Sequence, residues 1–158
     1  MSILNWLFKK KPELPEPPPE FLQADAPDWL VDIKGQEFPG GRRFSIRAQV
    51  HAAARTATAD IVRWPATEGA EPVAHSANLP RADLDRLLVI LGFSFPQDFV
   101  DIPGSEHEGI SVNVTVFRRD PLAAQGAACN LSEWLDTRKS APPVVEIGKM
   151  LWRIGPPA

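Results

Sequence analysis

The sequence predicts an α+β fold in which an antiparallel sheet, formed from two strand–strand–helix units, carries two helices on one face. Residues 44–51 and 110–116 alternate between apolar and polar side chains, which is typical of strands with one buried face and one solvated face. Residues 80–91 and 141–154 instead repeat apolar side chains at intervals of three and four, which indicates helices with one buried face. Each helix follows its own pair of strands, so a two-layer arrangement is expected.

The first unit begins with the strand at 44–51. A second strand is predicted over 56–64, and the segment 65–78, which holds proline, glycine and several small residues, is predicted to be a long loop. Pro80 opens the helix, and Gly92 is expected to end it in a left-handed conformation. The side chains expected to point inward are Phe44, Ile46, Ala48 and Val50 in the strand, and Leu84, Leu87, Leu88 and Leu91 in the helix.

The second unit repeats this order. Small residues dominate 123–131, which predicts a partner strand packed closely against a helix. A single helical turn is expected at 131–135, and Ser140 can cap the last helix. The alignment of 44–50 with 110–116 suggests an internal duplication. The inward side chains are expected to be Ile110, Val112, Val114 and Val116 in the strand, and Val144, Ile147, Leu151 and Ile154 in the helix.

The N-terminal quarter of the chain has a different composition. Six prolines fall between Pro12 and Pro27, and residues 12–37 contain seven acidic side chains and one basic one. Since each proline fixes φ and lacks an N–H donor, a disordered, extended linker is predicted. The predicted organisation is a short interaction segment at 1–11, a Pro-rich acidic linker at 12–37, and one α+β domain at 38–158.

Residues 1–11 combine apolar side chains with a run of lysines. The residues expected to make contacts are Trp6, Leu7, Phe8, Lys9, Lys10 and Lys11. Three interpretations are open: contact with an anionic membrane surface, docking to a partner protein, or packing on the domain itself. The charges follow the apolar stretch, and that stretch is too short for the apolar region of a secretory signal.

Composition narrows the classes of function. The chain has 158 residues, a formal charge of −3 and a single cysteine, Cys129. One cysteine rules out an intrachain disulfide and fits a reducing compartment, so a cytoplasmic protein is expected, either free or peripheral at the inner face of the membrane. The apolar and lysine-rich start before a Pro-rich linker resembles bacterial cytosolic proteins, so a bacterial-type protein is expected. No apolar run reaches the ~18 residues that a membrane-spanning helix needs. The balanced charge gives no overall signature of nucleic-acid binding.

A local excess of positive charge marks the predicted binding surface. Residues 42–64 hold five arginines and one acidic residue. This stretch could face an acidic partner, the chain's own acidic linker, or a nucleic acid with Trp64 stacking on a base. We expect the polar face of the sheet to bind a partner protein through Arg42, Arg43, Arg47, Gln49 and Asn113.

Candidate catalytic groups are few. Cys129 is surrounded in sequence by apolar residues, and as a nucleophile it would need His51 or His75 beside it. His107 lies among Asp101, Glu106 and Glu108, but their spacing matches no established metal-binding motif. The sequence therefore predicts a non-enzymatic, adaptor- or immunity-like binding protein with no catalytic residues, metal or cofactor. The alternatives are a small metal-dependent or cysteine hydrolase, and a weak nucleic-acid-binding module.

Overall fold

The structure, a computed structural model, describes residues 18–23, 25–38, 40–65, 69–92, 99–101, 109–119, 122–135 and 142–154. Across these residues seven strands form one sheet in the order β4-β3-β2-β1-β6-β7-β5, and all neighbours are antiparallel except β5 and β7. The strands are β1 (Trp29–Phe38), β2 (Arg42–His51), β3 (Thr56–Arg63), β4 (Val73–Asn78), β5 (Phe99–Asp101), β6 (Gly109–Arg118) and β7 (Ala123–Asn130). The helices are η1 (Pro19–Leu22), α2 (Arg81–Leu91), α3 (Ser132–Leu135) and α4 (Pro143–Ile154).

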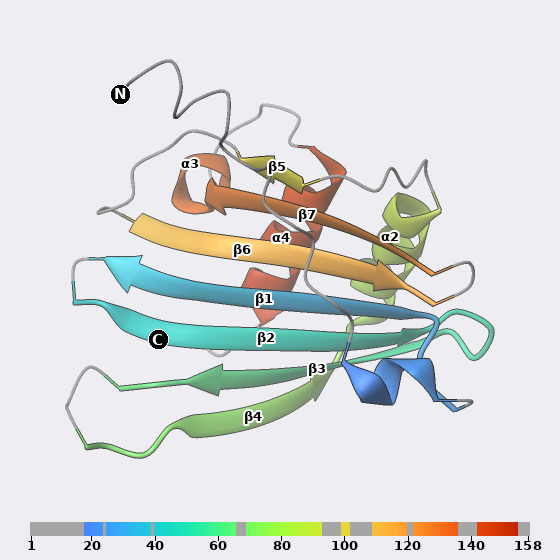
Figure 1. The fold of residues 1–158 in the computed structure, drawn as a ribbon, viewed down its shortest axis with the longest axis horizontal. Helices are drawn as coiled ribbons and strands as arrows, with labels where there is room; N and C mark the ends of the chain where they lie inside the picture. The colour runs from blue at the N-terminus through green and yellow to red at the C-terminus, as the bar shows by residue number, and fades with distance from the viewer. Residues whose placement is uncertain are drawn as a thin grey trace, which may run out of the picture.

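Helices α2 and α4 lie on the same face of the sheet, behind the strands in Figure 1. The main core lies between the two layers and contains the predicted inward side chains of β2 together with Val112, Val114 and Val116 of β6. Gly148 of α4 faces the sheet, where an added Cβ would lie 3.1 Å from Cγ2 of Val114. The α+β class, with an antiparallel sheet and helices on one face, is confirmed.

Helix α2 buries Leu84, Leu87 and Leu91, as its three-four spacing predicts. Gly92 follows the last residue of this helix, but its φ of −77° is right-handed. The predicted left-handed cap is therefore wrong, although the position of the helix end is right. The short helical turn predicted near residue 131 is present as α3.

The linker prediction is wrong for residues 29–37. These residues belong to β1, the central strand, which pairs with β2 on one side and β6 on the other. Val31 and Ile33 are almost fully buried in the core between the sheet and the helices. The seven acidic residues of 12–37 gave that whole segment the average composition of a linker, but the apolar residues of 29–37 form a strand. The tail at 1–11 and the remainder of the linker before residue 18 lie outside the described residues.

The long loop predicted over 65–78 is also only partly right, because its last six residues form β4, an edge strand paired with β3. The side chains of β4 are exposed on both faces, apart from the half-buried Ala77. A strand with no buried face has no apolar–polar alternation, which is the signal that revealed β2 and β6.

The sheet topology does not support an internal duplication. β2 and β6 flank β1, run in the same direction, and turn their apolar side chains to the same helix-covered face. However, β3 and β7 lie on opposite sides of their hairpin partners. The two hairpins are thus related by a reflection and not by a rotation, so two copies of one folded unit cannot produce them. The similarity of 44–50 to 110–116 follows from their shared two-residue period.

Candidate functional site on the open face of the sheet

The face of the sheet opposite α2 and α4, called the open face below, is polar over its central strands. The cross-strand registers place Lys34 of β1 between Ser45 of β2 and Asn113 of β6. One row further along, Asp32 lies between Arg47 and Thr115. The alternation of β2 and β6 correctly predicted which of their side chains face this side.

The segment 18–28, which includes η1, crosses one end of the open face (Figure 1), and the contacts that hold it there include the following three. Phe21 packs against Phe117 of β6, with their ring centroids 6.2 Å apart. The guanidinium Nη1 of Arg119 donates a hydrogen bond of 2.7 Å to the carbonyl oxygen of Ala26. The Asp28 carboxylate accepts a hydrogen bond of 2.8 Å from the backbone N–H of Ala52. These contacts fix the segment to β6 and to the residues that directly follow β2 and β6.

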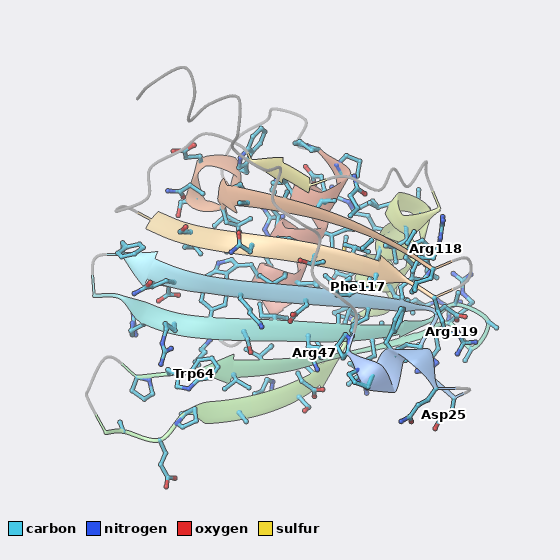
Figure 2. The ribbon with its side chains drawn as sticks, in the orientation of Figure 1. Asp25, Arg47, Trp64, Phe117, Arg118 and Arg119 are labelled. Carbon is cyan, nitrogen blue, oxygen red and sulfur yellow. The ribbon has the colours of Figure 1, made fainter. Side chains whose placement is uncertain are left out.

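A cavity of about 370 Å³ lies between this segment and the sheet. This volume is within the range of about 300–1,000 Å³ that is common for binding pockets. Its apolar walls are Pro18, Phe21, Ala26, Pro27 and Leu30, and its polar residues are Gln23, Asp25, Arg47 and Gln49. In Figure 2, Arg47 lies beside the end of the η1 segment, and Asp25 lies on the far side of that segment.

The charge around Arg47 is balanced by acidic neighbours. Its Nε lies 4.0 Å from Oδ1 of Asp32, which is beyond hydrogen-bond distance. On its other side, the β3 residue paired with Arg47 is Asp60, whose carboxylate accepts a hydrogen bond of 2.5 Å from the Ser76 hydroxyl. Within the described part of the chain, the Arg47 guanidinium has no hydrogen-bond acceptor. The N–H groups of the Arg47 guanidinium are therefore available to a ligand, although two aspartates, Asp32 and Asp60, lie on either side of this arginine.

The structure brings together two of the five predicted binding residues, Arg47 and Gln49, at the cavity. Asn113 lies on the open face of β6, away from the cavity lining. Arg43 is at the opposite end of β2, with its guanidinium carbon 5.6 Å from the centroid of the Trp64 ring, and Figure 2 shows Trp64 at that end of the sheet. Arg42 is on the other face by alternation, where its Nη2 lies 3.4 Å from Oε2 of Glu37.

The other arginines of the basic stretch also contact the chain itself. Arg63 shares Glu37 with Arg42 at 3.8 Å, and Arg55 pairs with Asp85. Two of the acidic partners, Asp32 and Glu37, belong to the acidic stretch at 12–37. Three interpretations of the positive charge were open. These ion pairs agree with one of them, contact with the chain's own acidic segment.

Cys129 lies in a setting that disfavours the thiolate. Its side chain is in the core on the helix-covered side of β7, and burial, followed by the nearby charge of Glu133, raises the pKa of its thiol to about 11. His51 is on the open face of β2 by alternation, and His75 is in β4, at the other edge of the sheet. Neither histidine therefore lies beside Cys129 to act as its base.

The predicted acidic cluster around His107 lies almost entirely outside the described residues. His107, Glu106 and Glu108 lie outside the described residues, as does the side chain of Asp101. Within the parts of the chain that are described, no three histidine, cysteine or acidic side chains group as metal ligands would.

Sequence reasoning missed the cavity residues contributed by 18–27, because that stretch was predicted to be part of a linker. Of the helices that the structure describes, none combines the length and apolar character needed to cross a bilayer. Comparisons with protein-family models, curated proteins and solved structures found no match to this chain.

Proposed function

We propose that this chain is a non-enzymatic, adaptor- or immunity-like protein that binds another protein on the open face of its sheet. The observation that carries the proposal is the cavity between segment 18–27 and the sheet, with Arg47 and Gln49 at its polar side. A pocket with apolar walls and a few convergent polar groups is typical of a binding site. The anchoring of its outer wall by Arg119 and Asp28 supports a pocket that is largely formed before binding.

The local charge favours a protein segment over a nucleic acid. Asp25 in the cavity lining, together with Asp32 and Asp60 on either side of Arg47, outnumber the positive charges of Arg47 and Arg119. Such a site repels a phosphate backbone and attracts a basic group. The expected occupant is therefore an apolar side chain of the partner protein, flanked by a lysine or arginine that faces the aspartates and by a carbonyl group that accepts from Arg47.

Site-specific photo-crosslinking tests this proposal. A photo-reactive amino acid replaces Gln49 at the cavity, and in a matched control it replaces Val89, which is 62% exposed on α2. Gln49 is expected to yield one crosslinked partner that Val89 does not. Adding Arg47→Ala should weaken that crosslink roughly tenfold, as loss of a charged hydrogen-bond donor at an interface does. Equal labelling from both positions, or a crosslink unchanged by Arg47→Ala, would contradict the proposal.

We further propose that residues 1–11 tether the domain to an anionic membrane surface on the cytoplasmic side. Trp6, Leu7 and Phe8 can enter the headgroup layer, while the following lysines attract anionic lipids at about 1 kcal/mol each. Deleting residues 1–11 is expected to abolish co-sedimentation with vesicles that contain phosphatidylserine. Replacing Lys9, Lys10 and Lys11 by glutamine should weaken it and remove its salt dependence. Equal pelleting of the full chain and the deletion variant would refute the tether.

A further inference from the structure

Strand β4 forms one edge of the sheet, and Figure 1 shows no other element along its outer side. Its register with β3 runs without a bulge from Arg63↔Val73 to Thr58↔Asn78. The strand contains no proline and no Lys, Arg, Asp or Glu. Sheet edges are normally protected from pairing with other chains by charges, prolines, bulges or covering segments. Within the described residues, β4 has none of these protections.

The hydrogen bonds of β4 define which of its backbone groups face outward. The N–H of Leu79 donates a bond of 3.0 Å to the carbonyl of Ala57, in register with the β3–β4 ladder. Antiparallel residue pairs alternate between bonded and non-bonded. Val73, His75 and Ala77 therefore bond to β3, and the outward N–H and C=O groups are those of Ala74, Ser76 and Asn78.

We infer that two copies of this chain associate through β4, antiparallel, with Ser76 opposite Ser76 of the second copy. Ala74 then lies opposite Asn78 at each side of the two-fold axis, and every outward backbone group finds a partner. A slip by two residues in either direction would place Pro72 or Pro80 opposite an outward group, where no N–H is available. The small side chains of Ala74 and Ser76 do not obstruct the approach of the second strand.

The charges that flank β4 select a second copy as the occupant. Glu71 precedes the strand, Arg81 follows it, and both are exposed with no ion-pair partner within the described residues. In the inferred antiparallel register, the end of each β4 that follows Glu71 lies beside the end of the other copy's β4 that precedes Arg81. A parallel arrangement would instead bring like charges together. The edge is thus complementary to itself in backbone groups and in charge, and the dimer is one continuous sheet.

Sedimentation velocity over a concentration series tests the dimer. The full chain is expected to show a concentration-dependent monomer–dimer equilibrium, and Ala74→Pro should leave only monomer. This substitution removes an outward N–H and no bond to β3, so β4 itself is retained. The matched control is Ala53→Pro, at the second position of the turn that the Arg55 N–H to Ala52 carbonyl bond closes, where proline is compatible. It should dimerise normally. A full chain that is monomeric up to about 0.5 mM (only about 4–5 kcal/mol of association), or a dimer that survives Ala74→Pro, would overturn the inference.

A charge exchange tests the register. Glu71→Arg or Arg81→Glu alone should weaken the dimer roughly tenfold, because two exposed ion pairs become like-charge contacts. The double variant should return to within about threefold of the natural chain, since each pair is then restored with its signs exchanged. If the double variant is as weak as the sum of the two single changes, the inferred register is wrong.

Discussion

Ile33→Ala is expected to lower the free energy of unfolding by about 3–4 kcal/mol, near the middle of the range for truncating a buried aliphatic side chain to alanine. The Ile33 side chain is 1% exposed in the central strand. In the registers it lies between Ile46 of β2 and Val114 of β6, on the face covered by the helices. Truncation removes apolar contacts and leaves a cavity that two paired neighbours prevent from closing. Urea denaturation followed by tryptophan fluorescence measures the loss.

Lys34→Ala provides the matched control, since Lys34 is the next residue of the same strand and its side chain is exposed on the open face. Its effect should stay within about 0.5 kcal/mol. A flexible linker would show equally small effects at both positions. Equal effects of Ile33→Ala and Lys34→Ala would therefore contradict the placement of β1 in the core.

β1 could not be recognised from composition because its polar residues have distant partners. Asp32 lies near Arg47, and Glu37 lies near Arg42 and Arg63, so acidic residues that suggested solvation are accommodated by charges on β2 and β3. The proline cluster ends at Pro27, directly before the strand. A strand can begin so soon after the prolines because β1 is stabilised by pairing with both β2 and β6, and not by its own local sequence.

The elements that the sequence did predict share a strong local signal. β2 and β6 each present a buried face against a polar face, and α2 has a leucine stripe, so periodicity alone identified them. β4 has exposed side chains on both faces and lacks such a signal. Periodicity also suggested a duplication, because the two strands 44–50 and 110–116 have the same alternation. Alternation determines which face of the sheet a side chain occupies, but it does not determine on which side of a strand the next strand pairs.

Only the residues that β2 contributes to the candidate site were predicted from the sequence, because β2 has a clear alternation. Alternation placed Arg47 and Gln49 on one polar face, and the structure finds both at the cavity. The opposite wall depends on contacts between residues far apart in the chain, such as Phe21 with Phe117 and Arg119 with the carbonyl of Ala26. Neither contact has a signature in local sequence, so the pocket itself required the fold.

Gly35→Ala is the second substitution expected to have a large effect, a loss of about 3 kcal/mol, at the upper end of what overpacking costs. Gly35 lies in β1 directly opposite Phe44 and Val112. An added Cβ would lie 2.5 Å from Cζ of Phe44, 2.7 Å from the carbonyl oxygen of Ser111 and 2.8 Å from Cγ1 of Val112. The Ser111 oxygen belongs to the backbone of the neighbouring strand, so rotation of side chains cannot relieve all three clashes. The missing side chain makes room for the Phe44 ring, which packs on Trp152 of α4 at 4.8 Å between ring centroids.

Adding Phe44→Leu to Gly35→Ala separates the clash with the ring from the other two. The shorter side chain relieves the contact with the ring, so the double variant should lose less stability than the two single changes together. The contacts with Ser111 and Val112 remain. Gly92→Ala is the matched control, because Gly92 has an ordinary φ of −77° and its nearest contact for a Cβ is 3.3 Å. Its effect should remain within about 1 kcal/mol, helped by the smaller entropy of the unfolded chain. If Gly35→Ala is no more destabilising than Gly92→Ala, the Phe44 ring does not lie over β1, and the packing of α4 on this end of the sheet would have to be redrawn.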